Sequence, residues 1–83
     1  MVRDPYELLV AACESHGLTA VRYIQPPRVR VSQPGAPTRL AEEVTLSQDG
    51  AAFLFSWGEP IGPTNKLADV ARRLKHVVSV VQP

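Results

Sequence analysis

Residues 42–57 read EEVTLSQDGAAFLFSW and predict two strands joined by a tight turn. The first strand, residues 40–46, alternates apolar and polar side chains, as a strand with one buried face does. Residues 47–50 end in Asp-Gly, a pair typical of hairpin turns. The second strand covers residues 51–57. One of its faces carries the side chains of Phe53, Phe55 and Trp57. This face is expected to be the main core face, because aromatic rings bury the most area.

A further strand is expected upstream, at residues 19–24, where β-branched and aromatic side chains are frequent. Pro26 and Pro27 interrupt it, because proline has no N–H to donate to a ladder. Residues 28–31, Arg-Val-Arg-Val, alternate strictly and are expected to resume the same strand after the break. Its valines would then face the core and its arginines the solvent.

Two helices flank these strands in the sequence. The first begins at Asp4 as N-cap, with Pro5 at the first helical position, and ends at Gly17. The second begins after Thr64 or Asn65 as N-cap. Its continuation, the valine-rich residues 77–81, is compatible with a frayed end, a longer helix or a strand. The apolar stripes comprise Leu8, Leu9, Ala12 and Cys13 in the first helix, and Leu67, Val70, Ala71, Leu74 and Val78 in the second.

These elements predict one α+β domain over residues 1–83. The expected fold is a two-layer sandwich in the order helix, three-stranded antiparallel meander, helix, because short connections favour neighbouring antiparallel strands. Both helices are expected to cover one face of the sheet. The other face would then be left open.

Charge and cysteine content narrow the class of protein. Nine basic and eight acidic residues give a formal net charge of +1, which lacks the basic excess typical of a nucleic-acid binder or of a membrane-surface patch. The single cysteine allows no disulfide within the chain and makes a cysteine-based metal site unexpected. No secretory signal or membrane-spanning segment is visible in the sequence. A cytoplasmic protein without membrane contact is therefore expected.

Catalytic motifs are missing from the sequence, and no enzyme activity, cofactor or metal is expected. Cys13 and His16 share a helix face through their i, i+3 spacing, which resembles a thiol–imidazole pair. Cys13 also belongs to the apolar stripe, where a buried thiol is inert. His16 and His76 are interpreted as helix-terminal cations.

The segment 53–63 admits two interpretations. It is either a core strand followed by a turn made rigid by glycine and proline, or an exposed anchor for another protein, since aromatic residues on stiff loops are frequent interface anchors. The open sheet face, with Ala52, Leu54 and Ser56, is expected to be too apolar for water and to be covered by a second copy of the chain, by another protein or by the valine-rich C-terminal residues. A second copy is preferred, because symmetric dimers are the commonest solution. The candidate protein-interaction residues are Leu54, Trp57, Glu59 and Ile61.

The stretch Ser-Trp-Gly-Glu-Pro-Ile-Gly-Pro at residues 56–63, with Asp-Gly before it and Ala-Arg-Arg-Leu at 71–74 after it, resembles small uncharacterised proteins of high-GC actinobacteria. The resemblance covers the C-terminal half. Some of those proteins accompany transcriptional regulators, so the resemblance implies a regulatory role and an actinobacterial origin.

The element order also resembles the double-stranded-RNA-binding domain, and the second helix, with Lys66, Ala68, Ala71 and Leu74, is similar to that family's last helix. The family's basic cluster is reduced here to Lys66, and Asp69 follows it, which would repel phosphate. The nucleic-acid contacts that this alternative implies are Arg28, Arg30, Arg39, Lys66, Arg72 and Arg73.

The sequence therefore favours a non-enzymatic protein-interaction module: a small adaptor, a chaperone-like protein or a regulatory subunit. Its expected partner is itself, as a homodimer, or another protein. A nucleic-acid-binding domain is the alternative.

Overall fold

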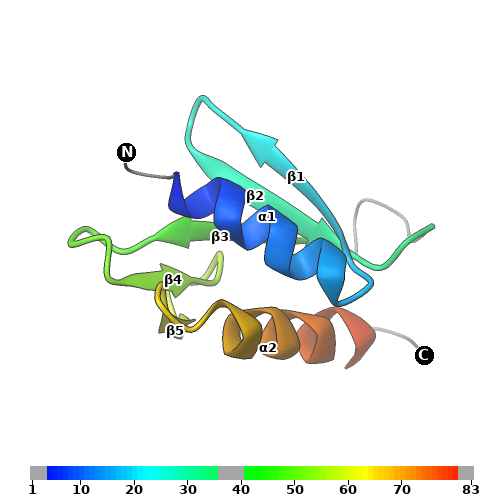
Figure 1. Cartoon of the computed structure of the whole chain (residues 1–83). Helices are drawn as coiled ribbons and strands as arrows, with labels where there is room; N and C mark the ends of the chain where they lie inside the picture. The colour runs from blue at the N-terminus through cyan, green and yellow to red at the C-terminus, as the bar shows by residue number, and fades with distance from the viewer. Residues whose placement is uncertain (1–3, 36–40, 81–83) are drawn as a thin grey trace.

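The computed structural model describes residues 4–35 and 41–80, and it shows an α+β fold, as expected (Figure 1). Two helices and five strands follow one another along these residues. Their bounds are α1 Pro5–Ser15, β1 Thr19–Tyr23, β2 Arg28–Ser32, β3 Glu42–Leu46, β4 Ala52–Leu54, β5 Pro60–Pro63 and α2 Leu67–Val80.

The strands form one sheet in the order β1-β2-β3-β4-β5, each antiparallel to the next (Figure 1). The prediction of three strands was wrong at two proline-rich places. Pro26 and Pro27 lie in a turn that reverses the chain, so residues 28–32 pair back onto β1 instead of prolonging it. Pro60–Pro63 forms the fifth strand at the edge of the sheet, where a missing N–H is tolerated.

Local signals set the ends of the helices. The Asp4 Oδ1 atom accepts a hydrogen bond from the Tyr6 N–H at 3.0 Å, and Gly17 follows α1 with a φ of 79°, which favours glycine. The second helix begins later than predicted: the Lys66 carbonyl accepts the N–H of Val70, so Lys66 precedes the first turn. The predicted N-cap Thr64 instead hydrogen-bonds through its hydroxyl to backbone carbonyls of the β3–β4 turn. The C-terminal valines continue the helix to Val80.

The core lies between the two helices and the sheet. Val29 and Val31 on β2 alternate with two arginines, and their buried side chains face the helices, as predicted. The helices α1 and α2 contact each other, and both contact β2. The buried residues of the core are Tyr6, Leu9, Cys13, Leu18, Val29, Val31, Val44, Phe53, Phe55, Ile61, Val70, Ala71, Leu74 and Val78.

Trp57 lies outside this core. The prediction that it shares a buried strand face with Phe53 and Phe55 was wrong, because β4 ends at Leu54 and its pairing with β5 shifts register between Phe53 and Leu54. Alternation therefore stops before Trp57, whose exposed fraction is 58%.

The open face of the sheet is more polar than expected. Leu54 and Ala52 are only half-buried there, but the face also includes strands β1 and β2, which bring Arg28, Arg30 and Tyr23 onto it. Both guanidinium groups lie over the Tyr23 ring, at 4.3 and 5.3 Å from its centroid. The expected continuous apolar surface is therefore interrupted by charge.

Candidate protein-interaction site

Trp57 occupies a tight turn between β4 and β5. The Phe55 N–H donates to the Glu59 carbonyl at 2.8 Å, and the Gly58 N–H donates to the Phe55 carbonyl at 3.0 Å. Gly58 has a φ of 91°, a backbone conformation that side chains disfavour. The Trp57 ring stacks on the buried Phe55 ring, with centroids 4.5 Å apart and planes 7° apart. The indole is thus exposed and held in one orientation.

Glu42 holds this turn to the sheet. Its Oε1 atom accepts hydrogen bonds from the Ser56 N–H at 3.1 Å and from the Glu43 N–H at 3.0 Å. Arg22 does not contribute to this contact, because its Nη2 atom donates to Asp4 Oδ2 at 3.0 Å, on the helix-facing side of β1. Sequence reasoning missed Glu42 as a support of the Trp57 turn, because only the folded turn brings Ser56 beside it.

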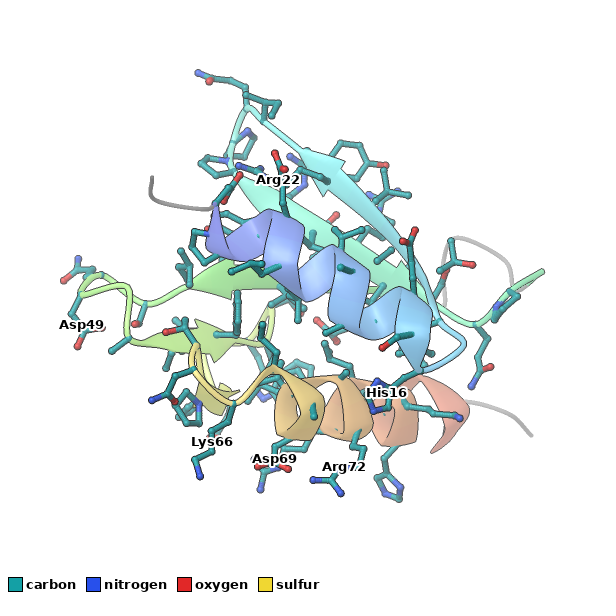
Figure 2. All side chains as sticks on the ribbon, viewed as in Figure 1. His16, Arg22, Asp49, Lys66, Asp69 and Arg72 are labelled. Carbon is teal, nitrogen blue, oxygen red and sulfur yellow. The ribbon has the colours of Figure 1, made fainter. Side chains whose placement is uncertain are left out.

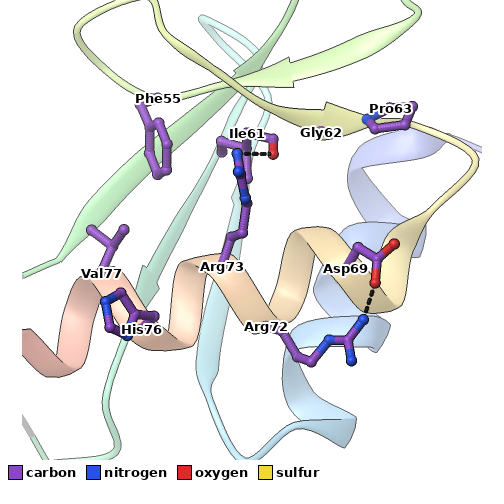
Figure 3. Close-up of a pocket in the computed structure, with 9 residues that line it drawn as sticks. All are labelled: Phe55, Ile61, Gly62, Pro63, Asp69, Arg72, Arg73, His76 and Val77. Carbon is purple, nitrogen blue, oxygen red and sulfur yellow. Dashed lines mark hydrogen bonds and ion pairs between the residues drawn. The ribbon is translucent and has the colours of Figure 1, made fainter.

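A hollow of about 830 Å³ adjoins the turn, between β5 and α2 (Figure 3). Phe55, which carries the stacked Trp57 ring, lines it together with the buried Ile61. Gly62 allows a close approach of β5 to the helix, since a Cβ there would lie 3.1 Å from Val70 Cγ2. The nine lining residues are Phe55, Ile61, Gly62, Pro63, Asp69, Arg72, Arg73, His76 and Val77.

The polar groups of the hollow come from α2. Arg73 Nη1 donates to the Ile61 carbonyl at 3.0 Å, and Arg72 forms an ion pair with Asp69, one helical turn earlier (Figure 3). The imidazole of His76 also lines the hollow. The hollow therefore places apolar surface beside hydrogen-bond donors, an arrangement typical of binding sites.

The structure brings together only part of the predicted interaction set. Trp57 and Glu59 are both exposed in the same turn. Ile61 was expected to be an exposed anchor, but its side chain is 2% exposed and lines the hollow from within the core. Leu54 lies half-buried on the opposite sheet face, in register with Thr45. The exposed anchor is therefore confined to the turn.

The residues of the nucleic-acid alternative do not share one face. Arg28 and Arg30 lie on the open sheet face, where Glu43 Oε1 is 3.5 Å from Arg28 Nε and Glu43 Oε2 is 2.8 Å from Arg30 Nη2. The hydrogen bond from Arg30 lowers the pKa of Glu43, so this carboxylate stays charged beside them. The other cations lie in α2 or just before it: Lys66 and Arg72, labelled in Figure 2, and Arg73, labelled in Figure 3. Arg39 lies outside the described residues.

The candidate thiol–imidazole pair is not set up for nucleophilic attack. Burial raises the pKa of the Cys13 thiol to about 11, with a smaller contribution from Glu14, and the side chain is fully buried. A thiol in that state is protonated at neutral pH. His16 Nδ1 donates to the Ala12 carbonyl at 2.9 Å and so closes the end of α1.

Residues 4–35 and 41–80 hold no group of three or more histidine, cysteine, aspartate or glutamate side chains that could bind a metal ion. No helix within the same residues is long and apolar enough to cross a membrane. No protein-family model, curated protein or solved structure matches the chain.

Proposed function

We propose that this protein is a non-enzymatic interaction module, acting as a small adaptor, a chaperone-like protein or a regulatory subunit. It binds a partner protein through Trp57 and the adjoining hollow between β5 and α2. The observation that carries this proposal is a tryptophan with 58% of its surface exposed, stacked on a core phenylalanine.

Tryptophan is among the residues that contribute most to protein–protein affinity, provided that it becomes fully desolvated in the complex. The Trp57 ring already has its orientation before binding, because Phe55 stacks on one of its faces and the Glu42 carboxylate holds the preceding residue. Little side-chain entropy is then lost on association, which favours binding. The adjoining hollow, which the exposed Pro63 and the half-buried Val77 also line, extends the contact area beyond one side chain.

The test compares partner binding by the wild type and by Trp57→Ala. Each immobilised protein is exposed to lysate of the source organism, the retained proteins are identified by mass spectrometry, and the candidate partner is purified for calorimetry. We expect Trp57→Ala to raise the Kd about 30-fold, the effect of an interface residue worth about 2 kcal/mol.

Ile24→Ala is the matched control, because Ile24 is also a large exposed side chain, with an exposed fraction of 69%, but it lies in the β1–β2 turn. It should leave the Kd unchanged. Equal binding by the wild type and Trp57→Ala would contradict the proposal, as would the absence of any specifically retained protein.

A further inference from the structure

We propose that a second copy of this chain pairs with the edge strand β1 in antiparallel orientation, around a two-fold axis at Val21, so that the two sheets become one. This surface is separate from the Trp57 turn, and the inference does not rest on the proposed function. The occupant is a second copy because a two-fold axis at the middle residue of β1 pairs the whole strand with itself and places no like charges opposite each other.

The strand β1 is an open edge. It pairs with β2 on one side, and it is the first strand of the sheet order among the described residues (Figure 1). An edge strand presents unpaired N–H and C=O groups that bind another strand readily. One carbonyl is already used, because Arg22 Nη1 donates to the Tyr23 oxygen. A carbonyl oxygen has two lone pairs, so it can accept a second hydrogen bond.

The two edge strands of the sheet differ in how well they are protected against pairing with another strand. The far edge, β5, contains Pro60 and Pro63, and the Ile61 carbonyl is bound by Arg73. Proteins use proline and charged side chains in this way to prevent strand pairing. The sequence of β1, Thr-Ala-Val-Arg-Tyr, contains no proline.

The one charged residue of β1 is held mainly on the helix-facing side of the sheet. Arg22 is turned toward the start of α1, where two of its nitrogens donate to Asp4 Oδ2 at 3.0 and 3.2 Å. Its guanidinium carbon also lies 4.4 Å from the centroid of the Tyr6 ring. These contacts hold most of the guanidinium over the helix-facing side of the sheet, and its contact with the edge is the hydrogen bond to the Tyr23 carbonyl.

Apolar side chains gather at the same edge. Val21 and Ile24 have exposed fractions of 44% and 69%, and Trp57 is the other large hydrophobic residue exposed to this degree among the described residues. Val21 lies at the centre of β1, and Ile24 directly follows its end. Pairing through β1 would remove part of this apolar surface from water.

The register follows from the sequence of the strand. A two-fold axis at Val21, the middle residue, lets all five residues of β1 pair. Val21 then faces Val21 of the second copy, while Ala20 faces Arg22 and Thr19 faces Tyr23. An axis at Arg22 would instead place two like charges opposite each other, which destabilises a strand pair. The interface is small, so dimerisation is expected to depend strongly on concentration.

Sedimentation velocity of the wild type over a concentration series provides the first test, with a reversible dimer as the expected result. Val21→Lys places two lysines opposite each other and should raise the dimer Kd about tenfold or more. Gln48→Lys adds the same charge at an exposed position in the β3–β4 turn and should leave the Kd unchanged. Circular dichroism confirms that both variants fold.

Disulfide trapping tests the register. Antiparallel neighbours have Cα atoms about 4.5–5.5 Å apart, within the range of about 4.4–6.8 Å that a disulfide spans. Val21→Cys should therefore form a covalent dimer under mild oxidation, and the buried Cys13 should not interfere. Thr19→Cys is the matched control, since the two Thr19 positions would lie about 13 Å apart along the strands.

Three results would overturn the inference: a wild type that stays monomeric throughout the series, a Val21→Lys protein that dimerises like the wild type, or faster cross-linking of Thr19→Cys than of Val21→Cys. Trp57→Ala separates this inference from the proposed function. It should weaken partner binding and leave self-association unchanged, whereas a dimer lost in Trp57→Ala would assign self-association to the Trp57 turn.

Discussion

Replacing Glu42 by alanine should loosen the turn that carries Trp57. In the wild type, one oxygen of the Glu42 carboxylate accepts the N–H groups of Ser56 and Glu43. A hydrogen bond to a charged group contributes about 1.5–3 kcal/mol. Ser56 is exposed, so water replaces much of its lost bond. We therefore expect the free energy of unfolding to fall by about 1–3 kcal/mol in Glu42→Ala, a large part of the total of about 4–12 kcal/mol typical of a chain of this length.

The local effect can be measured separately, because Trp57 is the only tryptophan of the chain. Its fluorescence therefore reports on this turn alone. In Glu42→Ala, acrylamide should quench Trp57 more strongly and the fluorescence anisotropy should fall, since the turn has lost its link to β3. Urea denaturation followed by circular dichroism measures the global loss.

Two further variants test whether the Glu42 carboxylate is what holds the Trp57 turn. Glu42→Gln keeps an acceptor oxygen without the charge and should lie between the wild type and Glu42→Ala. Glu43→Ala removes the neighbouring carboxylate, which pairs with Arg28 and Arg30 on the open face, and should leave Trp57 quenching unchanged. Glu42 does not position the turn if acrylamide quenches Trp57 equally in Glu42→Ala and in the wild type, and if the free energy of unfolding falls by less than about 0.5 kcal/mol. That is the range of an ordinary surface substitution.

Three other predictions concern the core and the charged face. Phe53→Ala removes a fully buried ring and should lower the free energy of unfolding by about 3–5 kcal/mol, measured by urea denaturation. Burial raises the Cys13 pKa from 9.0 to about 11, so the thiol should resist Ellman's reagent until the protein unfolds. Because the folded state favours the protonated thiol, the contribution of Cys13 to stability is complete below pH 9.0 and is lost as the pH rises toward about 11. Cys13→Ala should lack this loss of stability at alkaline pH. The Glu43 pKa is lowered chiefly by the hydrogen bond from Arg30, so its contribution is present above the ordinary glutamate pKa and is lost as the pH falls through the lowered value. Arg30→Ala should return the Glu43 pKa, measured by NMR titration, toward the ordinary value; an unchanged pKa would contradict this cause.

The elements that depend on local chemistry were predictable from the sequence. Asp4, Pro5 and Gly17 mark the ends of the first helix through capping and backbone conformation, which involve only neighbouring residues. The Asp-Gly turn between β3 and β4 is equally local, and there the Gly50 N–H donates to the Ser47 carbonyl at 2.9 Å.

The errors arose where pairing depends on distant residues. Prolines predict breaks in a strand, whereas residues 24–27 form a hairpin turn and Pro60–Pro63 forms an edge strand. The alternating pattern predicts that the strand face continues to Trp57, because the register shift beside Phe53 has no clear sequence signal. The role of Glu42 could not be predicted either, since its partner Ser56 lies 14 residues away and reaches it only through that shift and the following turn.

The contact between α1 and α2 has a consequence for synthesis on the ribosome. All five strands precede α2, so a sheet of neighbouring hairpins can assemble as the chain emerges. The stripe of α1 that meets α2 stays uncovered until residues up to Val78 have left the exit tunnel. A nascent chain stalled before α2 would therefore present a sheet and one helix with an uncovered apolar side, which is the form that chaperones and proteases bind.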